Sequence, residues 1–437
     1  MKIAVVGGGG VRTPLLVAGL TASDLPIDEI ALYDVDEARL RVIGGVAARM
    51  AARGAARPAP PRIELSASPE ACVSGADFVF TSIRVGGIER RVRDEMVAQR
   101  HGIAGQETVG PAGFAMAART IPPMVDYARQ IARAAPRAWI VNFTNPVGMV
   151  TEAMRSESDR VIGICDTPTE LFEQIAHALE LRPDRCGFDY FGLNHLGWVR
   201  EVYAYGAPQL ARLWNAPERL RAIYRVPLFE PGALRDLRLL PTEYVYYYDQ
   251  PERAFENVRR AGRTRGQAIA ELTRVLFDAL SDPVADQTAI YTSYLWTRRA
   301  GYMEIESGGE AAPPAFTPQL SGYDKIALSV VRAIHFDANA IIPLSVVNRG
   351  TLPDLLDDDV VEVPCVVNAN GARPLHAGRA PERVRPLLQQ VKEYERLTVR
   401  AARARSLDAA RAALSANPLV RGRAAAERLV DDLLPLW

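Results

Sequence analysis

The stretch KIAVVGGGGVRTPLLV (residues 2–17) decides the fold of this 437-residue chain. The run from Lys2 to Val6 predicts a short buried strand, and the apolar spacing from Thr13 onward predicts a helix. The four glycines between them predict a sharp turn whose backbone N–H groups can approach a pyrophosphate at the helix N-terminus. The stretch therefore predicts the first βα unit of a dinucleotide-binding fold.

The same turn supplies most of the candidate cofactor-binding residues, which are Gly7, Gly9, Gly10, Val11 and Asp34. Asp34 ends the next apolar run, where a carboxylate binds both hydroxyls of an adenosine ribose, so NAD is favoured over NADP. Arg12 stands where the usual fingerprint has its third glycine. A tight turn with a purely structural role is therefore the alternative.

Four more apolar runs have the length of strands: EIALYD (29–34), DFVFTSI (77–83), AWIVNFT (138–144) and RVIGIC (160–165). Continuously apolar strands separated by helix-length segments are typical of a parallel sheet covered on both faces. We therefore expect an α/β protein with an N-terminal Rossmann doubly wound sheet over residues 1–165.

The pattern changes after Pro168, where FDYFGLNHLGWVREVYAY (188–205) predicts strands that pair antiparallel. Residues 166–437 are expected to form an α+β domain for substrate, metal and oligomerisation. Apolar spacing over residues 387–414 predicts one surface helix, and the Pro- and Gly-containing stretches at 55–62 and 308–318 predict loops.

The composition favours a small-molecule partner. Lys+Arg and Asp+Glu both number 52, so no global positive field exists to bind nucleic acid or an anionic membrane. The four cysteines lack CxxC spacing, which fits a reducing cytoplasm rather than a disulfide framework. The apolar N-terminal stretch is too short for a signal peptide, and no apolar run approaches the roughly 20 residues that span a bilayer.

Further segments carry a more specific signal: SIRVGGIERRVRDE (82–95), GIAGQETVGPAGF (102–114), NFTNPVGMVTEA (142–153), GLNHLGW (192–198), VVEVPCVV (360–367) and ALSANPLV (413–420). Together they resemble the family 4 glycoside hydrolases, in particular their 6-phospho-β-glucosidase branch, over nearly the whole chain. This group is an NAD-dependent exception to the two-carboxylate rule of glycosidases. The resemblance implies NAD and Mn²⁺ as cofactors, a sugar phosphate glycoside as substrate, and a homo-oligomer, either dimer or tetramer.

The resemblance also implies that Cys165 and His195 bind the metal. Cys165 ends a predicted strand of the sheet, where ligand sites of doubly wound folds collect. On their own, the two residues would be interpreted as a buried cysteine and a core histidine. Two protein ligands would leave positions open for substrate hydroxyls, although thiolate is softer than manganese usually prefers.

Asp166 follows the predicted metal ligand and matches the residue taken as the leaving-group acid in the α-glycosidase branch. Many β-specific relatives have Asn at this point, so the choice between α and β linkage stays open. The alternative role of Asp166 is to cap the helix that begins near Pro168.

Tyr244 matches the base of the family, and Tyr246, Tyr247 and Tyr248 are its rivals. A tyrosine with a pKa near 10 is a poor base, so the metal and nearby arginines would have to lower that pKa. Glu107 matches a residue thought to increase the basicity of the tyrosine. Aromatic packing in a strand is the other interpretation of the tyrosine cluster.

The residues that match substrate-contacting positions are Arg91, Asn145, Arg265 and Asn194. Arginine suits phosphate through its planar fork of donors. Arg84 and Arg90 lie in the same segment as Arg91, and only the motif's register favours Arg91. The chain has three lysines, so arginine is its usual cation and a surface role is the alternative for each.

The mechanism implied by the resemblance begins with hydride removal from C3 of the sugar by NAD⁺. Deprotonation at C2, elimination of the aglycone, addition of water and return of the hydride follow, with no net redox change. An α-linked or unphosphorylated glycoside or uronide is an alternative substrate. An NAD-dependent 2-hydroxy-acid dehydrogenase is a rival enzyme, and a catalytically inactive NAD sensor is a second rival.

Overall fold

The computed structural model describes residues 1–54, 60–282, 284–309 and 322–434. Most of each predicted loop, at 55–62 and at 308–318, lies outside these ranges. None of the helices within them combines the length and the apolar character that crossing a membrane requires.

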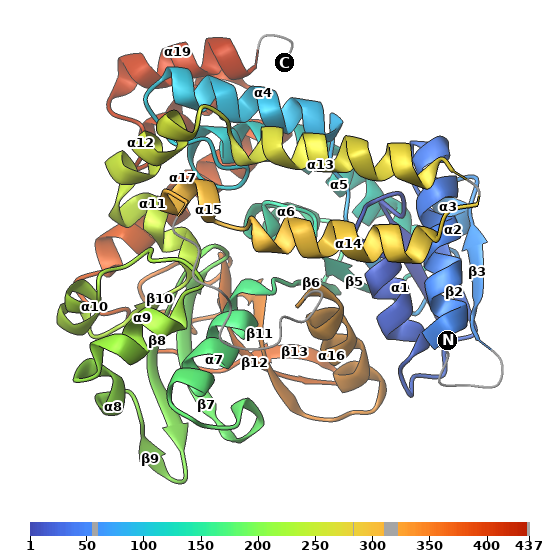
Figure 1. Cartoon of the computed structure of the whole chain (residues 1–437), viewed down its shortest axis with the longest axis horizontal. Coiled ribbons are helices and arrows are strands. Elements are labelled where there is room, and N and C mark those ends of the chain that lie inside the picture. The colour runs from blue at the N-terminus through green and yellow to red at the C-terminus, as the bar shows by residue number, and fades with distance from the viewer. Residues whose placement is uncertain (55–59, 283, 310–321, 435–437) are drawn as a thin grey trace.

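A large sheet organises the described residues, with strand order β13-β12-β11-β6-β5-β4-β1-β2-β3 (Figure 1). Its parallel strands are β1 (Lys2–Val6), β2 (Glu29–Tyr33), β3 (Arg62–Leu65), β4 (Phe78–Thr81), β5 (Trp139–Asn142) and β6 (Val161–Gly163). The order 3-2-1-4-5-6 is that of a Rossmann fold, so the predicted doubly wound sheet is confirmed. The edge strand β3 was not predicted, because its sequence, RIEL, alternates charged and apolar residues and so lacks the continuous apolar run by which the other parallel strands were recognised.

Three C-terminal strands extend this sheet beyond β6: β11 (Ala340–Val347), β12 (Val360–Asn368) and β13 (Gly371–Pro374). They pair antiparallel, and Ser345 of β11 opposes Gly163 of β6. The added strands cover what would otherwise be an exposed edge at β6. The sheet thus continues across the predicted boundary at residue 165, and the boundary itself stays a prediction.

The helices that flank the large sheet are α1 (Thr13–Thr21), α2 (Glu37–Gly54), α3 (Pro69–Val73), α4 (Gly87–Arg100), α5 (Gly110–Ala134), α6 (Val147–Met154), α7 (Thr167–Ala178) and α16 (Tyr323–His335). Two long helices, α13 (Arg265–Leu280) and α14 (Gln287–Ala300), lie side by side near the N-terminal βα units (Figure 1). Helix α13 also packs on α4, and α14 packs on α2. The C-terminal half therefore closes over the N-terminal half.

The predicted antiparallel strands after Pro168 form a second, smaller sheet. Its strands are β7 (Gly187–Leu193), β8 (Leu196–Ala204), β9 (Ala207–Pro208) and β10 (Leu240–Pro241). The remaining short helices of the C-terminal half are η1 (Pro183–Arg185), α8 (Ala211–Trp214), α9 (Pro217–Ile223), α10 (Pro231–Leu237), η2 (Glu243–Val245), α11 (Tyr246–Asp249), α12 (Pro251–Ala261) and α15 (Glu304–Ser307).

The single helix predicted over residues 387–414 is wrong, because the segment forms two helices, α17 (Arg385–Ala404) and α18 (Leu407–Ala416). Arg405 separates them in a left-handed backbone conformation at φ 48°. Such a residue ends a helix while the apolar spacing continues beyond it, so periodicity alone did not reveal the break. Helix α19 (Arg423–Leu433) follows and packs on α18.

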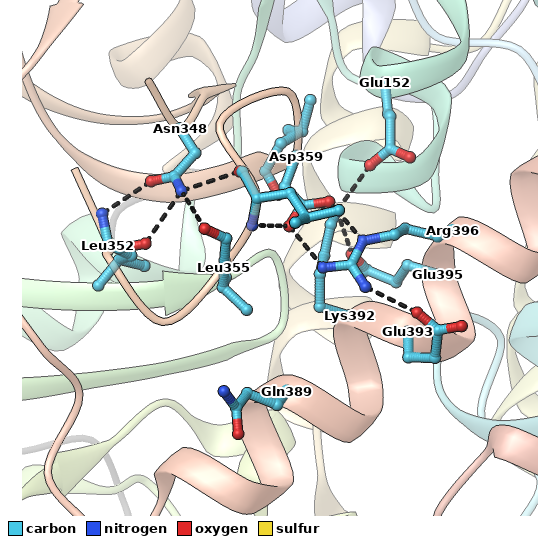
Figure 2. Close-up of polar contacts among 12 residues, drawn as sticks. Glu152, Asn348, Leu352, Leu355, Asp359, Gln389, Lys392, Glu393, Glu395 and Arg396 are labelled. Carbon is cyan, nitrogen blue, oxygen red and sulfur yellow. Dashed lines mark hydrogen bonds and ion pairs between the residues drawn. The ribbon is translucent and has the colours of Figure 1, made fainter. Parts of the chain in front are cut away.

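Lys392 of α17 is fully buried and joins three parts of the fold (Figure 2). Its ammonium donates to Glu152 of α6 at 2.6 Å, to Glu395 of its own helix at 2.9 Å and to the Val360 carbonyl of β12 at 3.0 Å. Burial opposes the charge, but the two carboxylates more than offset it and raise the pKa of Lys392. The charged network therefore fastens α17 to the sheet and to α6.

Replacing Glu152 by Gln is expected to lower the free energy of unfolding by about 1.5–3 kcal/mol, since a buried charged hydrogen bond becomes a neutral one. Urea unfolding of both proteins measures the change. Glu427→Gln is the matched control, because the ion pair of Glu427 with Arg423 is exposed and such pairs contribute about 0–1 kcal/mol. Equal losses in the two variants would contradict a structural role for the network.

Candidate functional site

A cavity of about 670 Å³, here called the cofactor pocket, lies at the carboxyl ends of β1 and β4. Its lining includes all five predicted cofactor-binding residues, Gly7, Gly9, Gly10, Val11 and Asp34. A Cβ on Gly7, where φ is +95°, would lie 2.3 Å from the Ser82 carbonyl oxygen. Asp34 accepts a hydrogen bond from the Gly9 N–H at 2.9 Å. The glycine turn therefore has the shape that close approach of a dinucleotide requires.

A second cavity of about 160 Å³, here called the reaction pocket, adjoins the first. It brings together residues predicted for catalysis, metal and substrate: Arg91, Glu107, Asn145, Cys165, Asp166, His195, Tyr244 and Arg265. Arg91, Glu107 and Asn145 line both cavities. Asn194 does not line the reaction pocket, and its amide donates to Glu362 at 3.1 Å.

The two predicted metal ligands come from different sheets. Cys165 follows the carboxyl end of β6, whereas His195 lies in the tight β7–β8 turn with φ +66°. No group of three or more His, Cys, Asp and Glu side chains suited to a metal occurs in the described ranges. A metal at this pair would thus have open positions for other ligands, as catalytic metals require.

The hydrogen bonds behind His195 fix which ring nitrogen carries the proton. Backbone N–H groups of Thr108 and Val109 donate to Gln106 Oε1 at 2.6 and 2.8 Å, and the Thr108 hydroxyl lies 2.8 Å from the same oxygen. Since that oxygen only accepts, the Thr108 hydroxyl donates to it. Thr108 Oγ1 must therefore accept from His195 Nδ1–H, 2.8 Å away, and Nε2 keeps its lone pair.

The ionisation of both ligands depends on burial. Burial lowers the pKa of His195 to about 4, against the opposing effect of Glu107, so the imidazole is neutral and can bind a cation. Burial and then the nearby Glu362 raise the pKa of the Cys165 thiol well above its ordinary value. A thiolate at Cys165 consequently needs a cation beside it.

Replacing Thr108 by Val is expected to weaken Mn²⁺ binding about 10-fold, because loss of a partner that orients a metal-binding histidine costs roughly 10–100-fold in affinity. The electron paramagnetic resonance signal of free Mn²⁺ measures the affinity. Thr108→Ser keeps the hydroxyl and is expected to restore binding to near the original level. A valine variant that binds as tightly as the serine variant would contradict the assigned tautomer.

Tyr244 belongs to the 3₁₀ helix η2 and not to a strand, so the packed-strand interpretation of the tyrosine cluster is wrong. Its ring stacks on His195, with centroids 3.8 Å apart and planes 10° apart. Burial and then Glu243 raise its pKa well above the ordinary value. A hydrogen bond with Tyr302 acts in the opposite direction, but the net effect of the surrounding protein is to raise this pKa, so a base role for Tyr244 would require a bound cation to lower it.

The rival tyrosines have other partners. Tyr246 donates to the Glu306 carbonyl at 3.0 Å, and the Tyr247 hydroxyl lies 3.7 Å from the sulfur of Met303. Tyr248 does not line the reaction pocket. Among the four, Tyr244 alone stacks on the predicted metal ligand, which favours it as the base.

The arginines of the IRVGGIERR segment differ in position. Arg91 lines the reaction pocket, whereas Arg84 and Arg90 do not. Glu107 pairs with Arg84 at 2.6 Å and with Arg91 at 2.9 Å, and Arg91 also pairs with Glu95 at 2.7 Å. Burial opposes ionisation of Glu107, but the two arginines outweigh it and hold its pKa well below the ordinary range. Glu107 is thus a fixed negative charge near Tyr244.

Arg265 and Arg298 contribute two further positive charges to the lining of the reaction pocket. Arg265 donates to the Arg298 carbonyl at 2.6 Å, and Arg298 donates to the Tyr294 hydroxyl at 2.9 Å. Neither guanidinium lies within ion-pair distance of a carboxylate in the described chain, although the nearby Glu306 favours the charged form of Arg265. Two such charges side by side suit a phosphate dianion.

Comparison with known proteins identifies the chain. The Family 4 glycosyl hydrolase model matches residues 2–181, and the model of that family's C-terminal domain matches residues 190–420. The chain belongs to family 4 of the glycosyl hydrolases. It is therefore a glycosidase, and the 2-hydroxy-acid dehydrogenase rival is set aside.

Relatives with both linkage specificities resemble this family 4 enzyme. It is 32% identical to a probable 6-phospho-β-glucosidase of Bacillus subtilis, over 99% of this chain and 96% of the relative. The 6-phospho-β-glucosidase of Thermotoga maritima, solved with manganese, NAD⁺ and glucose-6-phosphate, has a TM-score of 0.83 at 28% identity, covering 100% and 98% of the chains. A 6-phospho-α-glucosidase from gut microorganisms, solved with NAD and Mn²⁺, has a TM-score of 0.81 at 25% identity, covering 100% and 97%.

The family 4 pocket also contains charged residues that sequence reasoning missed, namely Glu170, Arg225 and Arg299, which lie near the predicted Asp166. Asp166 occupies the N-cap position of α7, but its side chain makes no capping hydrogen bond within the described helix and instead lies 3.4 Å from Arg12. Glu170, one turn later, pairs with Arg225 at 3.1 Å and Arg299 at 3.5 Å. The capping interpretation of Asp166 is therefore wrong for its side chain. Arg12, the unusual arginine in the glycine fingerprint, was the available sequence signal for the pairing with Asp166.

Proposed function

We propose that this enzyme hydrolyses 6-phospho-β-glucosides with NAD⁺ in the cofactor pocket and a divalent metal, Mn²⁺, at Cys165 and His195. The observation that carries the proposal is the reaction pocket itself. It adjoins the cofactor pocket, stacks Tyr244 on a histidine whose Nε2 keeps its lone pair, and is lined by two arginines that form no ion pair within the described residues. A simple hydroxy-acid dehydrogenase has no use for this combination.

The residues present fit both groups. The dinucleotide would be held by the glycine turn and Asp34, and Asn145 Oδ1 is buried without a hydrogen-bond partner in the described chain. Such an orphaned acceptor in a pocket indicates a missing ligand. When bound, NAD⁺ supplies reversible acceptance of a hydride from C3 of the sugar, and the metal supplies Lewis acidity.

Tyr244 acts on C2 of the sugar. With C3 at the ketone level, the C2 proton is acidic, and the phenolate of Tyr244 removes it while the C2–H electron pair expels the aglycone from C1. The negative charge of Glu107 raises the pKa of Tyr244, so the phenolate, once a bound cation has allowed it to form, is a stronger base. Water then adds to C1, and Tyr244 returns the proton to C2.

Asp166 is assigned to the departing aglycone. Its carboxyl lines the reaction pocket, and Arg12 holds it there. The Asp166 carboxyl would supply the proton to the leaving oxygen. Because an α-specific relative shares the fold, hydrolysis of 6-phospho-α-glucosides is the second candidate function.

The 6-phosphate is assigned to Arg265 and Arg298, with Arg91 and Asn145 holding the sugar. Arg298 extends the predicted set. The glucose-6-phosphate in the Thermotoga maritima structure supports a sugar phosphate as ligand. Asn194 binds Glu362 and thereby steadies the turn that carries His195, so its predicted contact with substrate stays a prediction.

A panel of nitrophenyl α- and β-glycosides, with and without 6-phosphate, tests the function in the presence of NAD⁺ and Mn²⁺. The 6-phospho-β-glucoside is expected to react fastest, and turnover in deuterated water is expected to place deuterium at C2 of the released sugar. Hydrolysis without label at C2 would exclude the elimination route. Stoichiometric accumulation of NADH would exclude hydrolysis without net redox change.

A further inference from the structure

A third cavity of about 320 Å³, here called the apolar pocket, lies between α7, α16, β7 and β11. Its walls are mainly apolar and include Phe172, Phe188, Ile326, Ile342 and Pro343. The rings of Phe172 and Phe188 stack with centroids 4.2 Å apart and planes 3° apart, and both are only half-buried. This cavity is separate from the cofactor pocket, with which it shares no lining residue.

The apolar pocket meets the reaction pocket at Glu170, Arg299 and Gly322, which line both. A Cβ on Gly322 would lie 3.0 Å from the Asp166 Cβ and 3.1 Å from Glu170 Oε1. Any larger residue at this position would crowd the junction. Glycine here keeps space beside the two carboxylates at the end where Asp166 lies.

The residues that the cavities share constrain where each part of a substrate can lie. The sugar's C3 must face the cofactor pocket, and the phosphate is assigned to Arg265 and Arg298. With Asp166 as the proposed leaving-group acid, the aglycone on C1 lies beside Asp166, where shared lining residues join the reaction pocket to the apolar pocket. We propose, resting on the function proposed above, that the apolar pocket binds the aglycone and selects glycosides with an aromatic aglycone.

The size and lining of the cavity fit this class of ligand. A cavity of about 150 Å³ lined by apolar side chains holds one benzene ring, so about 320 Å³ accommodates one or two fused rings. Lys325 and Glu173 at the rim neutralise each other at 3.1 Å. The pocket therefore favours an uncharged aromatic group over a second sugar, whose hydroxyls would lose water without gaining partners.

The test compares kcat/KM for phenyl and methyl 6-phospho-glucosides of the anomer that the wild-type enzyme accepts, with NAD⁺ and Mn²⁺ present. The ratio of the two values is compared between variants, so the intrinsic difference between leaving groups cancels. Ser329→Trp fills the apolar pocket from its exposed rim, and Phe188→Ala removes an aromatic wall. Both are expected to lower the phenyl-to-methyl ratio about 10-fold, the size of a lost aromatic contact.

Ser293→Trp is the matched control, because Ser293 is exposed on α14 and lines none of the three cavities. It is expected to leave the ratio unchanged. A ratio in Ser329→Trp equal to that of the control would overturn the proposal, as would equal loss of both substrates. Failure of the wild-type enzyme to hydrolyse either glycoside would instead refute the proposed function, so the two failures are distinguishable.

Discussion

Replacing Tyr244 by Phe is expected to lower kcat about 1,000-fold, within the range of about 10²–10⁴ that a positioned acid or base contributes. The change removes one hydroxyl and keeps the ring that stacks on His195. Binding of NAD⁺ and Mn²⁺ is therefore expected to change little, which fluorescence titration and electron paramagnetic resonance can measure. Exchange of the C2 proton with deuterated water should fall in parallel with kcat.

Tyr247→Phe and Tyr248→Phe are the matched controls, since each removes the same atom from the same segment. Tyr247 lines the reaction pocket but directs its hydroxyl toward Met303, and Tyr248 lies outside the pocket. Each control is expected to keep kcat within about 10-fold of the original, because neither hydroxyl has a role as acid or base. A larger loss in Tyr247→Phe than in Tyr244→Phe would transfer the base role to Tyr247.

The cofactor half of the site could be predicted because its residues obey local backbone rules. Gly7 adopts positive φ in the turn directly after β1, and Asp34 directly follows β2, so both positions belong to the local pattern of a strand and its turn. The continuously apolar strands of the Rossmann sheet were visible for the same reason. The strands β11 and β12 are largely apolar too, but nothing in their local sequence indicates that β11 pairs with β6.

The other half of the site depends on contacts between distant segments, which no local pattern reveals. Glu170 and Arg299 lie 129 positions apart in the chain and meet only because α14 closes over α7. Arg298 is one of many arginines, and its lack of a carboxylate partner is a property of the fold. Tyr244 was found through the family motif, yet the high pKa that burial imposes on it required the three-dimensional surroundings.

Replacing Cys165 by Ser is expected to lower activity about 100- to 1,000-fold, since a catalytic metal contributes several kcal/mol of charge stabilisation and the hydroxyl cannot supply an anionic ligand. Removal of metal from the original enzyme by a chelator should cause a similar loss, and Mn²⁺ added with a thiol reductant should restore activity. The serine variant should not recover at the same Mn²⁺ concentration.

The pH dependence of Mn²⁺ affinity separates the thiolate's role from simple damage to the pocket. In the metal-free protein the pKa of Cys165 is raised, so the group is a thiol at neutral pH and must release its proton when metal binds. Below that pKa the affinity should rise about tenfold for each unit of pH. His195, with its pKa lowered to about 4, adds no proton release above about pH 5. Serine at position 165 should abolish the slope, and a variant that keeps both the slope and the activity would refute Cys165 as a ligand.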